Sequence, residues 1–192
     1  IEPTVGGWGA CKGHDGQVGL FCVGDGETYN VPVEMAETRY GIRVDEHSLH
    51  TDGAGAGEYR GGSGAVRVYR SMNENQTFTA SFGRNKWPVW GAAGGKDGSV
   101  NYFQFIDADG TVSEPMGIAA RRVMNTNDVV RMVTATGGGY GNPFKRPAEK
   151  VAMDVKNEYI TVEQAKADYG VLVDPETFKV LGLTEERQKA EK

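Results

Sequence analysis

Glycine is the feature of this sequence that most restricts its fold. The 192 residues include 28 glycines but only 7 prolines. The glycines do not recur at every third position, so a collagen triple helix is excluded. Two dense glycine clusters lie at 51–64 and 136–143. Because glycine has no Cβ atom, such clusters predict turns, irregular connections and backbone angles that other residues rarely adopt.

Alternating apolar and polar residues between the glycine clusters predict β-strands. The predicted strands are 42–50, 65–72, 76–84, 99–107 and 128–137. The apolar run 17–23, bounded by glycines, predicts a further, buried strand. The short polar connection NENQ predicts that 65–72 and 76–84 form a hairpin. We therefore expect a mainly β structure, built mostly from antiparallel strands with glycine-rich loops.

Helical patterns flank this β-rich portion. Residues 33–40 have helical spacing, and Gly41 is expected to end this helix. After residue 143 the sequence predicts two short helices, the second capped by Thr161, then two short strands over 171–181 and a charged helical tail. The expected fold class is α+β, with a β-rich portion over 1–143 and a helical carboxy-terminal appendage over 144–192.

Composition limits the classes of function. A formal net charge of −5 argues against binding of nucleic acid through its phosphates. No apolar run approaches the roughly 20 residues that span a membrane, and the start does not resemble a signal peptide. Cys11 and Cys22 lack the spacing of a zinc site and are expected to be free thiols in a reducing cytoplasm. The start at Ile1, without a methionine, suggests a fragment, a processed chain or a truncated one.

The glycine cluster at 136–143 (TGGGYGNP) permits two interpretations. Consecutive glycines can direct several N–H groups at a phosphate. However, the cluster lacks the Lys-Ser/Thr pair of a Walker loop, and Pro143 delays any following helix. We favour a tight structural turn over a nucleotide-binding loop.

Four polar residues are candidates for a functional site. His14 and Asp15 are adjacent in a glycine-rich loop, where imidazole and carboxylate are suited to metal binding or proton transfer. They are too few for a closed metal site, so no metal ligand is assigned. Asn30 and Glu34 flank a proline that restricts the backbone, and Glu34 is expected in a first helical turn, where a carboxylate also offsets the helix dipole.

Five segments, in order, resemble the hydantoinase-B/oxoprolinase family. The match covers nearly the whole chain and corresponds to the carboxy-terminal portion of that family. The segments are GGWGA with GHDG (6–10 and 13–16), YNVPVEMAETRYGIRV (29–44), DGAGAGEYRGGSGAVRVYR (52–70), NDVVRMVTATGGGYGNP (127–143) and VAMDVKNEYITVEQAKADYGVLV (151–173).

The resemblance implies a subunit of an ATP-dependent complex. In this family an A-type partner binds ATP and magnesium and phosphorylates a carbonyl-containing substrate. Hydantoinases and oxoprolinases then hydrolyse cyclic amides, while a related branch carboxylates ketones such as acetone or acetophenone. The divalent metal is expected in the amino-terminal part of the B-type subunit, so this segment by itself is expected to bind no cofactor.

His14, Asp15, Asn30 and Glu34 match positions of the family motifs and are candidates to line the active-site cavity. The expected partners are the A-type subunit and the amino-terminal part of the B-type subunit, with no nucleic acid or membrane. Three hypotheses stay open: an amidohydrolase or carboxylase subunit that is inactive alone, a non-catalytic structural subunit, and a free-standing nucleotide binder using residues 136–143.

Overall fold

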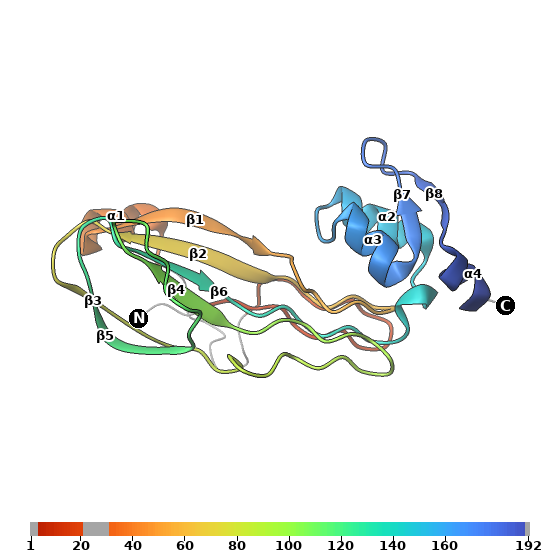
Figure 1. The fold of residues 1–192 in the computed structure, drawn as a ribbon, viewed down its shortest axis with the longest axis horizontal. Coiled ribbons are helices and arrows are strands. Elements are labelled where there is room, and N and C mark those ends of the chain that lie inside the picture. Colours follow the sequence, from red (N-terminus) through yellow and green to blue (C-terminus); the bar gives the residue numbers. More distant parts are fainter. Residues whose placement is uncertain (1–3, 21–30, 191–192) are drawn as a thin grey trace.

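The computed structural model describes residues 4–20 and 31–190 and forms an elongated α+β molecule with mostly antiparallel strands (Figure 1). Helix α1 and the strands up to residue 133 lie toward one end, and the remaining helices lie at the other together with the last two short strands. The elements of the first part are α1 (Val33–Tyr40), β1 (Ile42–His50), β2 (Gly64–Ser71), β3 (Gln76–Ser81), β4 (Tyr102–Ile106), β5 (Ile118–Met124) and β6 (Val129–Val133). Those of the second are η2 (Pro143–Lys145), α2 (Ala148–Lys156), α3 (Val162–Tyr169), β7 (Val171–Val173), β8 (Val180–Leu183) and α4 (Glu185–Ala190).

The main sheet has four antiparallel strands in the order β1-β2-β6-β4. Strands β3 and β5 form a separate two-stranded ribbon that packs on one face of it. Phe78 of the ribbon meets Phe103 and Phe105 of β4 edge-to-face, with ring centroids 5.7 and 5.5 Å apart. Edge-to-face pairs of this kind add to the gain from burying the rings.

The predicted hairpin between 65–72 and 76–84 is wrong. Both segments are strands, but β2 pairs with β1 and β6, whereas β3 pairs with β5. Because β1 and β6 are hydrogen-bonded to the two edges of β2, no edge of β2 is left for β3 to pair with. The chain turns away from the main sheet after Ser71. The Ser71 hydroxyl supports this turn by hydrogen bonding to the carbonyl oxygen of Asn73 and the side-chain oxygen of Gln76.

Beyond the sheet, four glycine-rich segments run side by side without forming β-ladders (Figure 1), and the first and third of them turn back on themselves at 11–14 and 92–95. We call this assembly the glycine bundle; its segments are 6–16, 54–63, 90–98 and 134–141. The last segment exchanges backbone hydrogen bonds with the other three. Gly137 N–H donates to Gly62 O (2.8 Å), Gly139 N–H to Lys96 O (2.9 Å), and Gly138 O accepts from Ala10 N–H (2.9 Å).

The three consecutive glycines of the central segment face three different neighbours. A Cβ atom added to Gly137 would overlap the carbonyl oxygen of Trp8, one on Gly138 that of Trp90, and one on Gly139 that of Ala56. A β-strand offers only two alternating faces, whereas a polyproline-II helix has about three residues per turn. The central segment therefore has threefold geometry, and glycine is required because neighbouring backbones occupy the side-chain positions.

The second part of the chain has its own apolar core. Val151 and Val155 of α2, Ala165 and Tyr169 of α3 and Val171 of β7 are buried together. Three sequence predictions of helix ends are confirmed. Gly41 and Gly170 close their helices in the left-handed conformation (φ 61° and 64°), and Thr161 forms a complete capping box with Gln164.

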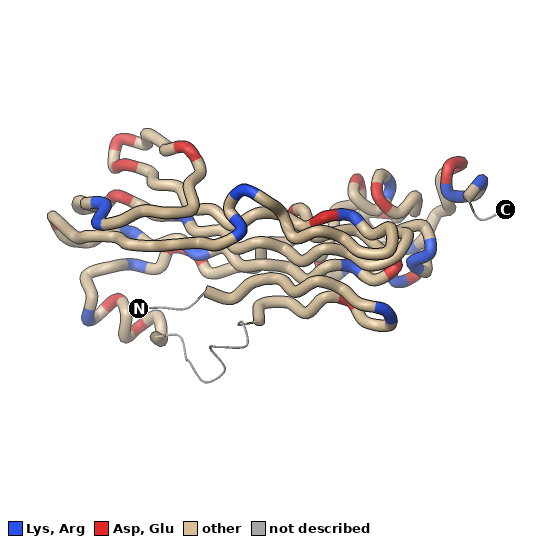
Figure 2. Tube along the Cα trace, turned by 90° about the horizontal axis from the view of Figure 1, so that it is seen from below, with Lys and Arg blue, Asp and Glu red and all other residues tan. Residues whose placement is uncertain are grey.

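None of the helices in the described ranges is long and apolar enough to cross a membrane. Charged residues lie at both ends of the molecule, on the α1 side and around the carboxy-terminal helices (Figure 2).

Candidate functional site

Asp15 is held by an arginine from the far end of the sequence. Arg146 donates from Nη1 to Asp15 Oδ1 (2.7 Å) and from Nη2 to Oδ2 (2.9 Å). The backbone N–H of Arg60 donates to the same carboxylate (2.7 Å). Partial burial alone would raise the pKa of Asp15, but the hydrogen bonds and charge of Arg146 outweigh it and lower that pKa below its ordinary value.

A second carboxylate completes a buried ion network. Arg146 Nε donates to Asp154 Oδ2 (2.8 Å), and Arg60 Nε lies 3.5 Å from Asp154 Oδ1. The side chains of Arg60, Arg146 and Asp154 are all more than nine-tenths buried. Burial raises the pKa of Asp154 in spite of the two guanidinium groups, whereas the two carboxylates keep the pKa of Arg146 raised despite its burial.

The network joins the glycine bundle to the carboxy-terminal helices. Arg60 belongs to the bundle, Asp15 to its first segment, and Asp154 to α2. Arg187 of α4 extends the junction, since its guanidinium donates to the carbonyls of Arg146 (2.8 Å) and Tyr169 (2.9 Å). Burial also raises the pKa of Tyr169, whose hydroxyl stays protonated. This arrangement is suited to fastening two parts of the chain together.

His14 occupies a different environment from its neighbour Asp15. It closes a tight hairpin in which its backbone exchanges hydrogen bonds with that of Cys11, both at 3.1 Å. The residues of this hairpin tip, 11–14, are all exposed. The structure thus turns Asp15 inward to Arg146 and leaves His14 facing solvent.

Glu34 lies far from these two residues. It is exposed in the first turn of α1, as predicted, whereas the tip at 11–14 lies beside the carboxy-terminal helices at the other end of the molecule (Figure 1). Asn30 lies outside the described residues. A cavity built by this chain alone therefore cannot contain both His14 and Glu34.

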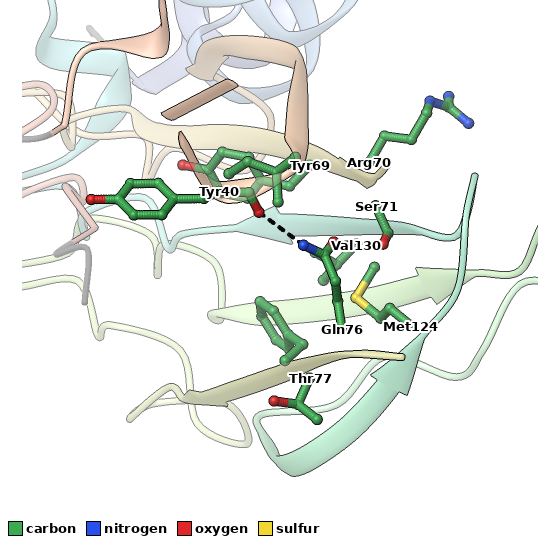
Figure 3. A pocket seen from close by; sticks show the side chains of 10 residues that line it. Tyr40, Tyr69, Arg70, Ser71, Gln76, Thr77, Met124 and Val130 are labelled. Atoms are coloured by element: carbon green, nitrogen blue, oxygen red, sulfur yellow. Dashed lines mark hydrogen bonds between the residues drawn. The ribbon is translucent and has the colours of Figure 1, made fainter. Parts of the chain in front are cut away.

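A pocket of about 310 Å³ lies between the end of α1, the main sheet and the β3–β5 ribbon (Figure 3). Its wall is mainly apolar. Gln76 spans its polar side, donating from Nε2 to the Tyr40 carbonyl (2.8 Å) and accepting from the Ser71 hydroxyl (2.6 Å). The apolar lining residues are Tyr40, Ile42, Tyr69, Phe78, Met124 and Val130.

Sequence reasoning missed this pocket and the ion network, because both are assembled from distant segments. One signal was available. Asp154 follows Val151 by three positions in α2, so it falls on the helix face that the apolar pattern assigns to the core. A carboxylate on such a face is expected to have a cationic partner.

The described residues do not fit a resident metal or a phosphate loop. No group of three or more His, Cys, Asp or Glu lies close enough to hold an ion within those ranges. The expected tight turn at 136–143 is also wrong, because its glycines form the central segment of the bundle. The N–H groups of Gly137, Gly139 and Tyr140 already donate to backbone carbonyls of neighbouring segments.

Comparison with known proteins gives consistent matches. The family model for hydantoinase B/oxoprolinase matches residues 1–143. The B-type subunit of a putative D-/L-hydantoinase from Pseudomonas sp. (strain NS671) is 31% identical over 175 residues, 90% of this chain. The beta subunit of the caprolactamase from Pseudomonas jessenii is 30% identical, and the match covers 91% of this chain.

Two solved structures share the fold. The ATP-dependent caprolactamase of Pseudomonas jessenii matches 97% of this chain with a TM-score of 0.76 and 29% identity. A nucleotide-free acetone carboxylase matches the same share with the same TM-score but 18% identity. This chain spans only 29% and 31% of the two curated subunits, and 32% and 29% of the two solved chains. On the family match and these relatives, the chain belongs to the hydantoinase B/oxoprolinase family.

Proposed function

We propose that this chain is part of an ATP-dependent enzyme complex that hydrolyses a cyclic amide. The supporting observation is its similarity, over nine-tenths of its length, to a hydantoinase subunit and a caprolactamase subunit. The acetone carboxylase supports the fold alone, since its identity to this chain is 18% against 29% for the caprolactamase. The amidohydrolase is therefore preferred over the ketone carboxylase.

In the proposed reaction an A-type partner transfers the γ-phosphoryl group of ATP to the amide oxygen. This converts a poor electrophile into one whose oxygen can leave as phosphate. Water then attacks the activated carbon, and the ring C–N bond breaks with protonation of nitrogen to leave an acyl phosphate. A second water hydrolyses this acyl phosphate to the carboxylate and inorganic phosphate. In this proposal the metal and ATP are bound by parts of the complex other than this chain.

The chain's own contribution is a rigid wall and an anchoring surface. Asp15 is ion-paired with Arg146, so its role is to fix the end of the 11–14 hairpin relative to the carboxy-terminal helices. His14, exposed at that hairpin, and Glu34, exposed on α1, are the candidates to meet substrate or another subunit.

The test is the assembled complex, given ATP with hydantoin, 5-oxoproline or caprolactam in one set of assays and acetone with bicarbonate in the other. ATP-dependent ring opening without ketone carboxylation is expected. Carboxylation alone would establish the alternative branch, and the absence of ATP turnover with every substrate would reject both.

A non-catalytic role is the second candidate, favoured by the ion pairing of Asp15. It is tested by His14→Ala and Glu34→Ala in the same complex. Unchanged turnover by both variants supports a structural subunit, whereas a large loss with normal assembly rejects it.

A further inference from the structure

The pocket between α1, the main sheet and the β3–β5 ribbon has no part in the proposed reaction. Its walls come from α1 and from β1, β2, β3, β5 and β6. The described residues that line it include no carboxylate, imidazole, thiol or amine, so it lacks the groups that most often transfer protons. Its volume of about 310 Å³ lies at the lower end of the range of small-molecule sites. The pocket is therefore suited to binding a small ligand rather than to catalysis.

The charge of the lining favours an uncharged ligand. Arg70 is the only charged side chain among the described residues that line the pocket, and its guanidinium is already paired. Its Nε and Nη2 lie 2.8 and 2.6 Å from Asp45 Oδ2, and Nη1 donates to the carbonyl of Asn127 (3.2 Å). Figure 3 shows the Arg70 side chain directed away from Gln76. Because a charge in mainly apolar surroundings needs an opposite charge beside it, charged ligands are disfavoured here.

Gln76 offers the polar contacts that a ligand can use. Its Nε2 donates to the Tyr40 carbonyl (2.8 Å), and its Oε1 accepts from the Ser71 hydroxyl (2.6 Å) (Figure 3). Because a carbonyl oxygen can only accept, the contact with Tyr40 fixes which end of the amide is the nitrogen. A glutamine amide has two N–H donors and two acceptor positions. One donor and one acceptor position of Gln76 therefore have no partner within the described part of the chain.

The two existing hydrogen bonds also hold the Gln76 amide in place before a ligand binds. Ser71 is buried in the main sheet, and the Tyr40 carbonyl belongs to the last residue of α1, just before the left-handed Gly41. A polar group that is already ordered loses less entropy when a ligand binds to it, which favours binding.

We propose that this pocket binds a small, uncharged amide that has an apolar body and whose N–H and C=O groups point to the same side. The ligand carbonyl accepts from the remaining N–H of Gln76, its N–H donates to the remaining acceptor position, and its apolar body lies against Met124 and Val130. Primary amides and ring amides have this arrangement, whereas a linear N-substituted amide prefers the trans form, in which the two groups point to opposite sides. The inference goes beyond the proposed function, because it adds a non-catalytic ligand site built by this chain alone.

The site is tested by titrating the purified chain with benzamide and following the NMR signals of its methionine methyl groups. Met124 lines the pocket, whereas Met153 lies on α2 in the other part of the molecule and is the internal control. A saturable shift of the Met124 signal at millimolar benzamide is expected, with the Met153 signal unchanged.

Two analogues of benzamide test the chemical class of the ligand. N-methylbenzamide keeps the ring but prefers the trans amide, and benzoate carries a charge, so each should bind at least tenfold more weakly than benzamide. The proposal is overturned if benzamide causes no saturable shift of the Met124 signal, or if either analogue binds as tightly as benzamide.

The variant Gln76→Leu tests the hydrogen-bonding group. It removes both open polar positions with little change in size, so benzamide should bind at least tenfold more weakly. Gln188→Leu is the matched control and should bind as the wild type does, since Gln188 Nε2 likewise donates to a backbone carbonyl, that of Leu183 (2.9 Å), but in the carboxy-terminal part. Unchanged affinity in Gln76→Leu overturns the proposal.

Equal unfolding midpoints of the two variants exclude misfolding as the cause of weaker binding. If Gln76→Leu does not fold, the comparison of benzamide with its two analogues on the wild-type chain decides by itself. Binding is measured on this chain alone, so its absence leaves the proposed amide hydrolysis standing. Absence of amide turnover in the assembled complex would likewise leave this site standing.

Discussion

Arg146 and Asp15 form a two-pronged ion pair between residues 131 positions apart in the sequence, with N–O distances of 2.7 and 2.9 Å. The same guanidinium holds Asp154, so a single side chain connects the first segment of the glycine bundle to α2. Planar arginine matches two carboxylates in a way that lysine cannot.

Arg146→Ala should lower the free energy of unfolding by ~3–5 kcal/mol, because two carboxylates lose their buried partner. Arg146→Lys should cause a smaller loss, since lysine keeps the positive charge but lacks the planar guanidinium group that donates to both carboxylates. Urea denaturation measures both. Lys189→Ala, which removes a fully solvated pair with Glu185, is the control and should change little. Wild-type stability of Arg146→Ala would contradict the network.

Acid should weaken the contribution of Asp15. Its folded-state pKa lies below the unfolded value, so the ionised group stabilises the fold above about pH 4 and loses this effect as pH falls through the folded-state pKa. Asp15→Asn should cost about 1–2 kcal/mol at pH 7, reduced by the 35% exposure of the side chain. The difference from wild type, followed by urea denaturation from pH 7 to 3, should shrink below about pH 4. A constant difference would argue against this ion pair.

Gly138→Ala should disrupt the bundle, because the new methyl group would overlap the Trp90 carbonyl. Backbone atoms cannot move aside cheaply, so a loss of at least ~2–3 kcal/mol is expected. Gly83→Ala is the matched control, since an added Cβ there meets nothing within 4 Å, and it should stay within ~0.5 kcal/mol of wild type. Thermal unfolding compares the two, and equal melting temperatures would refute the threefold packing.

Phe78→Ala should loosen the β3–β5 ribbon from the main sheet, since Phe78 makes edge-to-face contacts with Phe103 and Phe105. A half-buried phenylalanine should contribute ~2–4 kcal/mol, somewhat less than a fully buried one. Val123→Ala, on the solvent side of the ribbon and 50% exposed, should cost much less. Hydrogen exchange of the ribbon amides would localise the effect. Faster exchange across the whole molecule, rather than in β3 and β5, would contradict it.

The sequence predicted the features that depend on local chemistry. Gly41 and Gly170 end helices because only glycine adopts the left-handed conformation without strain, and Thr161 caps α3 because its hydroxyl reaches the backbone N–H of Gln164. Each of these signals lies within four residues of the structure that it determines. The α+β class and the division into strands and later helices followed from the same local patterns.

Features that depend on distant partners were not predictable in this way. Pairing of β2 with β1 and β6 is decided by three separated segments, so a short polar connection to β3 suggested the wrong hairpin. Glycines 137–139 carry no side chains, so no apolar periodicity reveals their threefold packing. Asp15 was singled out beside His14, but its partner Arg146 gives no local sign of the contact.

The threefold geometry of the bundle also restricts how its segments can change in length. In a chain with about three residues per turn, inserting one residue turns every later residue by about 120°. A single insertion before Gly137 would therefore direct side chains into the positions that backbone carbonyl oxygens of the neighbouring segments occupy. Insertions or deletions of three residues would restore the facing directions and shift the segment by about 9 Å along its axis. The central segment should accept length changes in triplets while rejecting those of one or two.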